Sequence, residues 1–372
     1  MTASNRAMSS TYLEWAKLHS VEKYNLATSG IQSYPLSALP LSLTDLEING
    51  PTVYGYEPLQ ERLAQKSGVG TNCVVVSNGT SMSNHLAMAA LLQPGDDVLV
   101  ECPTYGLLLE VASYLGANII RFDRRMADEF AVDVDEIRAK ITPRTRLIVL
   151  TNLHNPTGAF IDEETLYLVG EIAAEAGAHV LVDEVYLDMM VDAVAESGSA
   201  PPVRSCIHLG SQFVVTTSLT KAYGLSGLRC GWILAEPALA KRIWRLNDLF
   251  NATPSHPTEL LSVLALDHLE QVRNRARHLL QTNRRALDAF LSDRSDLSVF
   301  SPPAGTVVFP KLLSGDVDEF CVLLRRDYET NVVPGRFFEL PQHFRIGIGG
   351  DTEMTAEGLR RLGLALDKFG SR

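Results

Sequence analysis

The stretch RLIVLTNLHNPTGAFIDEETLYLVGEIAAEAGAHVLVDEVY, residues 146–186, decides the fold. It begins and ends with short runs that are almost continuously apolar, which is typical of strands buried on both faces. Between these runs, apolar side chains recur at helical spacing and Gly177 stands at the C-terminal end, which predicts a helix. The residues of this stripe are Leu166, Val169, Ile172, Ala173 and Ala176. A strand, a helix and a second strand in this order predict a right-handed crossover within a parallel sheet.

The same alternation of strand and helix extends along the chain in both directions. Further apolar runs occupy residues 73–79, 97–103, 118–123, 213–221 and 230–236. With the two runs above, they predict an α/β domain of residues 50–245 that holds a mainly parallel seven-stranded sheet covered by helices.

The pattern changes after residue 245. An arginine-rich helical stretch at 273–291 precedes short strand-like pieces, and a last helix is expected at 355–370. Residues 246–372 therefore predict a smaller α+β domain. Segment 1–49, in which prolines interrupt any long helix, is expected to join this smaller domain.

The composition excludes several classes of protein. The 372 residues carry 33 Lys and Arg against 44 Asp and Glu, a net charge of −11, whereas nucleic-acid binding requires clustered positive charge. No run of about 18 apolar residues occurs and the first residues lack a signal-peptide core, so no membrane span or secretion is expected. The 5 cysteines are scattered without a CxxC pair, which predicts reduced thiols in a cytoplasmic enzyme and no metal site.

Polar groups follow the apolar runs where open α/β sheets bind ligands, beyond the carboxyl ends of the strands. The run at 73–79 leads into Gly79, Thr80 and Ser81. These residues suit a phosphate at a helix N-terminus, although a plain turn and N-cap would use the same residues. The spacing matches neither GxGxxG nor a Walker A loop, so neither a dinucleotide nor a nucleoside triphosphate is expected.

Three further runs end in groups that can perform chemistry, namely Asn155, Asp183, Tyr186, Ser218 and Lys221. A carboxylate at the end of an apolar strand is costly unless it meets a cation. A buried lysine has a lowered pKa and can form a Schiff base.

These motifs resemble those of the class I/II aminotransferases, the fold type I enzymes that use pyridoxal phosphate (PLP). They are NPTG (155–158), the Asp-x-x-Tyr turn (183–186), SLTKAYGLSGLRCGW (218–232), PGDDVLVECPTY (94–105), VVPGRFF (332–338) and FRIGIGG (344–350). Their order and spacing cover nearly the whole chain. The resemblance implies a large PLP-binding domain, PLP as the cofactor, and an amino acid and a 2-oxo acid as substrates.

The resemblance assigns four residues to the ring of PLP. Lys221 matches the lysine that binds PLP covalently and later moves the α-proton of the substrate. Asp183 matches the carboxylate that pairs with the pyridine nitrogen and keeps it protonated. Asn155 and Tyr186 match the two hydrogen-bond donors to the phenolic oxygen of PLP.

The resemblance also implies contacts to the phosphate, the ring face and the substrate. The implied phosphate ligands are Gly79, Thr80, Ser81, Ser218 and Arg229. Tyr105 matches an aromatic ring stacked on the cofactor. Arg345 matches the arginine that binds the α-carboxylate of the substrate bidentately. Gly30 and Asn155 are expected beside the substrate as well.

The leading hypothesis is an aminotransferase, and one alternative keeps PLP but changes the outcome. Elimination, cyclisation or oxidation of an amino acid would use the same cofactor contacts and a different substrate pocket. Ser29 and Gly30 resemble a segment of the capreomycidine synthase branch, which cyclises a hydroxyarginine. His85 and His154 match no functional residue of the family and are expected to be structural.

Two hypotheses from other classes find less support in the sequence. The S-x-x-K spacing of Ser218 and Lys221 also occurs in serine β-lactamases, but the S-D-N and K-T-G elements that those enzymes need are absent. A transcription regulator built on the same fold would need a DNA-binding domain, for which the N-terminal segment is too short and not basic.

The resemblance further implies a homodimer whose active sites lie at the subunit interface. The segment INGPTVYGYEP (48–58) suits an exposed loop and carries Tyr54 and Tyr56, of the aromatic type that is enriched in interface cores. The sequence leaves open whether either tyrosine reaches the neighbouring active site, and which amino acid is the substrate.

Overall fold

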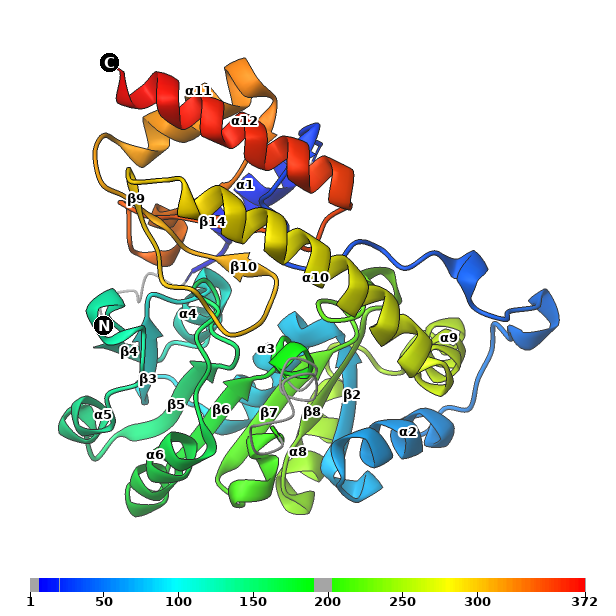
Figure 1. Ribbon diagram of the computed structural model, residues 1–372. Coiled ribbons are helices and arrows are strands. Elements are labelled where there is room, and N and C mark those ends of the chain that lie inside the picture. The colour runs from blue at the N-terminus through cyan, green and yellow to red at the C-terminus, as the bar shows by residue number, and fades with distance from the viewer. Residues whose placement is uncertain (1–6, 20, 191–202, 372) are drawn as a thin grey trace.

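The computed structural model describes residues 7–19, 21–190 and 203–371 (Figure 1). Its central element is a seven-stranded sheet in the order β2, β8, β7, β6, β5, β3, β4. The strands are β2 (Val74–Asn78), β3 (Asp97–Cys102), β4 (Asn118–Asp123), β5 (Thr145–Thr151), β6 (His179–Asp183), β7 (Phe213–Ser218) and β8 (Cys230–Leu234). Only β8 runs antiparallel to its neighbours. The predicted α/β class and the mainly parallel seven-stranded sheet are confirmed.

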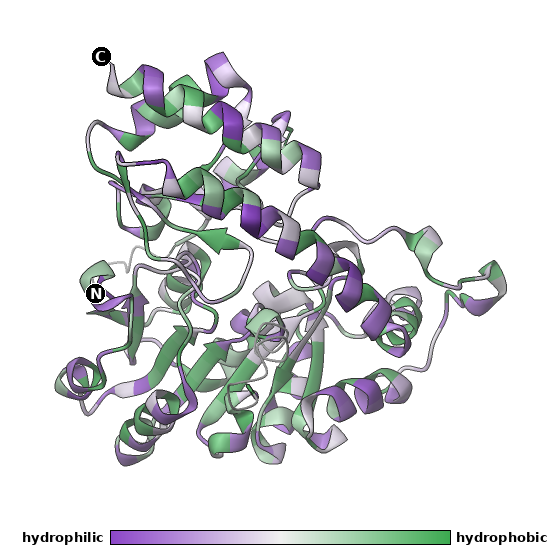
Figure 2. Ribbon diagram, in the orientation of Figure 1, coloured by the Kyte–Doolittle hydropathy of each residue, from purple (hydrophilic) through white to green (hydrophobic). Residues whose placement is uncertain are grey.

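Both faces of this sheet are buried, which explains why its strands are apolar without alternation. Along β5, for example, Leu147 and Val149 pack into one hydrophobic cluster, whereas Ile148 and Leu150 pack into another on the opposite face. Successive side chains of a strand point to opposite faces, so each face needs its own helical cover. In Figure 2 the strands are mostly hydrophobic, whereas the surrounding helices are mixed.

The helices of the large domain are α2 (Glu57–Ser67), α3 (Gly79–Leu91), α4 (Gly106–Tyr114), α5 (Val134–Lys140), α6 (Glu163–Glu175) and α8 (Pro237–Asn247). Four of them, α3 to α6, connect successive strands, and α2 and α8 flank the sheet at its two ends in the sequence. Helix α6 is the predicted crossover helix: Asp162 caps its N-terminus by accepting from the backbone N–H of Thr165, and Gly177 follows with a φ of 64°. Such a left-handed residue is common just after a helix and ends it.

Both ends of the chain build the smaller domain, as predicted. Its helices are α10 (Leu269–Ser292), α11 (Val317–Tyr328) and α12 (Thr352–Gly370), and α9 (His256–Asp267) leads into them. A small sheet joins β10 (Val307–Val308), β14 (Phe344–Gly347) and β13 (Val333–Pro334), and β9 (Leu297–Ser298) pairs with β11 (Lys311–Leu312). From the N-terminal segment, β1 (Tyr24–Asn25) pairs with β12 (Thr330–Asn331), and Leu26 packs into this domain's core.

The domain bounds at residues 50 and 245 stay predictions, and the second of them falls inside α8. Helix α1 (Thr11–Leu18) lies near the junction of the two domains, where it packs against α4 of the large domain. Within residues 7–19, 21–190 and 203–371, no helix is both long and apolar enough to span a membrane.

Candidate active site

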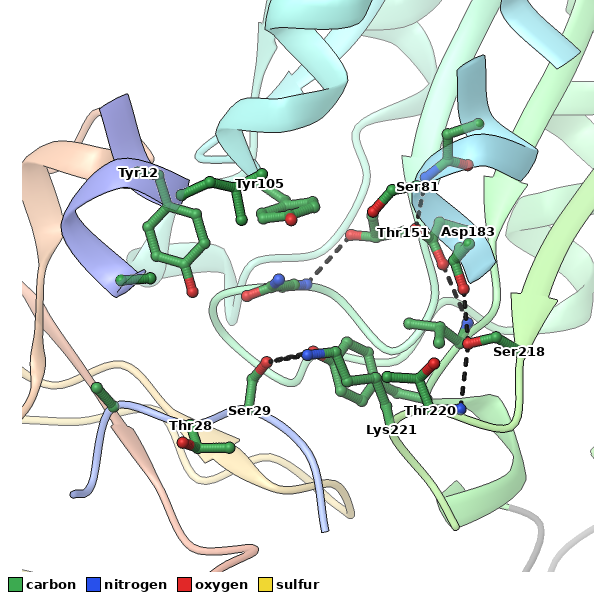
Figure 3. A pocket seen from close by; sticks show the side chains of 18 of the residues that line it. Tyr12, Thr28, Ser29, Ser81, Tyr105, Thr151, Asp183, Ser218, Thr220 and Lys221 are labelled. Carbon is green, nitrogen blue, oxygen red and sulfur yellow. Dashed lines mark hydrogen bonds between the residues drawn. The ribbon is translucent and has the colours of Figure 1, made fainter. Parts of the chain in front are cut away.

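A cavity of about 470 Å³ lies beyond the carboxyl ends of β5, β6 and β7, between the two domains (Figure 3). The N-terminus of α3 and the N-terminal segment of the chain complete its wall. Nine of the predicted site residues line it: Thr80, Ser81, Tyr105, Asn155, Asp183, Tyr186, Ser218, Lys221 and Arg229. Gly30, Gly79 and Arg345 do not line it but contact residues that do.

One end of the cavity presents a buried carboxylate. Asp183 is the last residue of β6, and its Oδ1 accepts from the backbone N–H of Val185 at 3.1 Å. Its Oδ2 accepts from the side-chain amide of Asn84 at 3.0 Å. Burial raises the pKa of Asp183 to about 6. In the described part of the chain no cation lies at ion-pair distance from this carboxylate, so the site provides a counter-charge for a ligand cation.

Asn84, which sequence analysis missed, fixes the orientation of this carboxylate. It lies on α3 facing the sheet, and its amide oxygen accepts from the hydroxyl of Thr216 at 2.5 Å. Because Thr216 donates to the amide oxygen of Asn84, the amide N–H groups of Asn84 point toward Asp183. The position of Asn84 on the same face as Ala87 and Met88 of α3 offers little signal, because this helix holds several other polar residues. A buried amide nevertheless requires partners.

A second buried network supports the turn that carries Asn155. Glu101 on β3 forms an ion pair with Arg124 at 2.7 Å, and both side chains are fully buried. The other oxygen of Glu101 accepts from the backbone N–H and the hydroxyl of Thr151. The Thr151 hydroxyl in turn accepts from the backbone N–H of Asn155 at 3.2 Å. No motif of the sequence indicates this network, because Glu101 of β3, Thr151 of β5 and Arg124, which follows β4, are far apart along the chain.

Lys221, which follows β7, extends its amine into the cavity. Its Nζ donates to the hydroxyl of Ser29 at 3.1 Å, and the phenol of Tyr186 donates to the same oxygen at 2.8 Å. Desolvation by the surrounding protein, with the positive charge of Arg345, lowers the pKa of Lys221 to about 8. Burial raises the pKa of the Tyr186 phenol, which therefore stays a hydrogen-bond donor at neutral pH.

Another part of the cavity wall suits an anion. Thr80 donates to the hydroxyl of Ser218 at 2.8 Å, which joins the N-terminus of α3 to the end of β7. The side chain of Asn78 forms no capping hydrogen bond, so the first backbone amides of α3 remain open to a ligand. Gly79 has a φ of 76°, and a Cβ there would clash with the guanidinium of Arg229. Glycine at this position therefore lets the cation approach the helix N-terminus.

Arg345 on β14 is fully buried, with most of its donors already occupied. Its guanidinium donates to Asn155 Oδ1 at 2.8 Å, to the hydroxyl of Tyr12 at 2.9 Å and to the carbonyl of Ala27 at 2.9 Å. Its Nε has no hydrogen-bond partner in the described structure. A substrate carboxylate would thus have to compete with Tyr12 of α1, which was not among the predicted site residues.

Tyr105 and Gly30, two further predicted site residues, lie beside Tyr12 and Lys221. The ring of Tyr105 meets that of Tyr12 edge-on, with centroids 5.6 Å apart. Gly30 packs on the lysine stem, since a Cβ there would lie 3.3 Å from Cδ of Lys221.

The two histidines and two tyrosines singled out in the sequence lie outside the cavity lining. His154 is buried and hydrogen-bonds Pro103 O and the hydroxyl of Thr157, whereas His85 packs against Phe250. Tyr54 donates to Asp248 at 2.9 Å and stays 55% exposed. Tyr56 packs edge-on against His256 with centroids 4.9 Å apart.

The groups present fit PLP. The buried Asp183 carboxylate suits a protonated ring nitrogen, and the amides, hydroxyls and Arg229 suit a phosphate. The same cavity is lined by a lysine amine of lowered pKa and by the donors Asn155 and Tyr186.

The chain is similar to known proteins over almost its whole length. Residues 45–362 match the family model "Aminotransferase class I and II". Capreomycidine synthase of Streptomyces vinaceus is 30% identical over 338 residues, 87% of this chain and 85% of that protein. A probable aspartate/prephenate aminotransferase of Aquifex aeolicus is 27% identical over 84% of this chain and 81% of its own. The crystal structure of a PLP-dependent aminotransferase from Streptococcus suis superposes with a TM-score of 0.89 at 28% identity, covering 96% of this chain and 97% of that one.

Proposed function

Because the chain belongs to the class I and II aminotransferases and is a PLP-dependent aminotransferase, we propose that the residues of this cavity exchange an amino group between an amino acid and a 2-oxo acid. The observation that carries the proposal is the convergence of Asp183, Lys221 and Tyr186 on one cavity, with Arg345 bonded to its wall. When bound, PLP supplies an acceptor for the amino group and stabilises negative charge at the α-carbon.

Lys221 acts as the base in this proposal. Its lowered pKa of about 8 leaves a fraction of the Lys221 side chains as neutral amine near neutral pH. The neutral Nζ can take up the α-proton of the amino acid and can later release that proton to another atom of the bound ligand. Asp183 holds a positive charge of the bound ligand against the buried wall of the cavity. The hydrogen bond from Asn84 favours its ionised form against the effect of burial.

The substrate carboxylate binds Arg345, with the backbone of Gly30 nearby. The unpaired Nε of Arg345 and the Nη2 atom now bonded to Tyr12 are the donors for a bidentate contact. Substrate binding then requires the Tyr12 hydroxyl to move, which couples helix α1 to occupancy of the site.

Transfer of a labelled amino group tests this function. PLP-loaded enzyme is incubated with single ¹⁵N-labelled amino acids and 2-oxoglutarate, and the products are identified by mass spectrometry. The expected result is ¹⁵N-glutamate together with the 2-oxo acid of the donor. Release of free ammonia without ¹⁵N-glutamate for every donor would contradict transamination.

A second candidate function rests on the similarity to capreomycidine synthase. Cyclisation would use the same lysine and aspartate, and it retains the amino group on a product with a new ring. The experiment above separates the two functions when hydroxyarginine is among the donors, because a cyclase yields a product that has lost water and no 2-oxo acid.

We also propose that the enzyme works as a cytoplasmic homodimer. The segment around Leu43, Ile48 and Val53 extends from the body of the molecule and exposes its apolar side chains (Figure 1). Leu249 and Phe250 are exposed too, and such surfaces usually pack against another subunit. Light scattering is expected to give twice the mass of the chain, and a variant with Leu43 and Ile48 changed to Ser is expected to be monomeric.

A further inference from the structure

Ser29 places its hydroxyl between Lys221, the proposed base, and Tyr186. Its Oγ lies 3.1 Å from Nζ of Lys221 and 2.8 Å from the phenolic oxygen of Tyr186. Figure 3 shows the Ser29 side chain pointing from the N-terminal segment across the cavity to Lys221. The residue is only 6% exposed, so few water molecules can compete for these hydrogen bonds.

The backbone fixes this position from several sides. The carbonyl of Ser29 accepts from the hydroxyl of Thr306 at 2.7 Å. The backbone that follows Ser29 is hydrogen-bonded to the backbone of Lys221, because the N–H of Ile31 donates to the carbonyl of Lys221 at 2.9 Å. Gly30 packs on the lysine stem as described above. The hydroxyl is therefore held in place by the fold rather than by the lysine alone.

A hydroxyl can serve as partner to an amine in both of its protonation states. It accepts from an ammonium N–H and donates to the lone pair of a neutral amine. In this structure the Tyr186 phenol donates to Ser29. When the phenol instead donates to an oxygen of the cofactor, its own oxygen can accept from the Ser29 hydroxyl, so the two residues stay linked. Asp183 of β6, Arg345 of β14 and Arg229 also act on the charge of Lys221, but none of them forms a hydrogen bond to Nζ in the described structure.

We propose that Ser29 is a positioning residue that holds the free amine of Lys221 and links it to Tyr186 while the lysine carries the substrate proton. The inference rests on the proposed role of Lys221 as base. Without the Ser29 hydroxyl, Nζ would keep its stem but lose the partner that orients its lone pair, so that fewer encounters with the α-proton are productive.

The variant Ser29→Ala tests this on the full-length chain freed of PLP. It removes one oxygen and keeps Cβ. Trinitrobenzenesulfonate labelling of Lys221, measured by peptide mass spectrometry against pH, gives the pKa of the amine. We expect the pKa to fall by about half a unit to one unit, because the ammonium loses a charge-assisted hydrogen bond. Thr28→Val, which removes a hydroxyl from the adjacent residue, is the matched control and is expected to leave the pKa unchanged.

Kinetics of the PLP-loaded enzyme supply the second measurement. Ser29→Ala is expected to lower kcat about tenfold with little change in KM, because proton transfer and not binding is affected. An α-deuterated donor should show a larger isotope effect than with the wild type. The Ser29→Ala and Tyr186→Phe losses should also be non-additive. Ser29→Cys, which keeps a weaker hydrogen-bonding atom, is expected to lie between wild type and Ser29→Ala.

An unchanged pKa of Lys221, or a lower kcat without a larger isotope effect, would overturn the role of Ser29. A failure of the inference about Ser29 can be distinguished from a failure of the proposed function. If Lys221→Ala still transaminates, the function assigned to the lysine is wrong. If Lys221→Ala is inactive while Ser29→Ala matches wild type in all three measurements, only the inference about Ser29 is wrong.

Discussion

The two walls of the cavity are built in different ways. The wall of the large domain takes Asp183, Ser218 and Lys221 from the ends of adjacent strands of one sheet. The facing wall brings Tyr12 of α1 and Ser29 of the N-terminal segment together with Arg345 of β14, more than 300 residues away from them. Strand register fixes the first wall, whereas packing between distant segments fixes the second.

This difference separates chemistry from substrate binding. Strand register places Asp183 beside Thr151 on β5 and Thr216 on β7, so the groups that we propose hold the cofactor cannot shift independently. Tyr12 belongs to a short helix of the N-terminal segment and reaches Arg345 through its hydroxyl. We therefore expect changes in the first wall to reduce kcat, and changes in the second to act largely on KM.

Replacement of Lys221 should have the largest effect. Lys221→Ala removes the residue that we propose as both covalent anchor and base, so turnover is expected to fall by about 10⁴-fold or more. The absorbance of lysine-bound PLP in the visible range should disappear with it. Lys66→Ala, at a lysine paired with Asp188 outside the cavity, is the control and should retain both properties. Borohydride trapping of PLP on Lys221→Ala would show that another lysine is the anchor.

Replacement of Asp183 is expected to come next. Asp183→Asn keeps the size of the side chain and an oxygen that can accept from Asn84, but it removes the negative charge. We therefore expect kcat to fall about 10³-fold. Binding of PLP, measured by fluorescence, should weaken far less than kcat falls. A near-normal kcat would mean that another group stabilises the charged ring.

Arg345 and Tyr12 test the second wall. Arg345→Ala is expected to raise KM for the amino donor about 100-fold, because the carboxylate loses a bidentate partner. Tyr12→Phe frees a donor of Arg345 while retaining the ring, and KM should fall or stay within about threefold of wild type. Steady-state kinetics of both variants give the two constants. A loss of kcat in Tyr12→Phe as large as that in Asp183→Asn would contradict the expectation that the second wall acts mainly on KM.

Asn84→Ala should give the smallest effect, visible as a change in pH dependence. The hydrogen bond from Asn84 lowers the pKa of Asp183, so its loss raises that pKa above its present value of about 6. Asp183 must be ionised to hold a positive ring, so the acidic limb of kcat/KM should move to higher pH by about half a unit to one unit. At pH well above this limb the variant should approach wild type. Asn118, which hydrogen-bonds Gly95 and Asp97 at the amino ends of β3 and β4, provides the control variant Asn118→Ala.

The sequence by itself determined the sheet, its two-sided cover and the residues at the strand ends. Apolar runs mark buried strands, and the edge of a parallel sheet gathers whatever follows them, so Asn155, Asp183 and Lys221 could be placed in one site. These inferences depend on local patterns, and local patterns survive in a linear sequence.

Only the tertiary structure decided the partners of those residues. Asn84 reaches Asp183 across α3 and the sheet, Ser29 reaches Lys221 from 192 positions away, and Tyr12 occupies a donor of Arg345. None of these contacts leaves a periodic or spacing signal, because each depends on how two distant segments pack. Whether a buried polar group is satisfied is set by the atoms that packing brings within about 3 Å of it, and no linear motif records them.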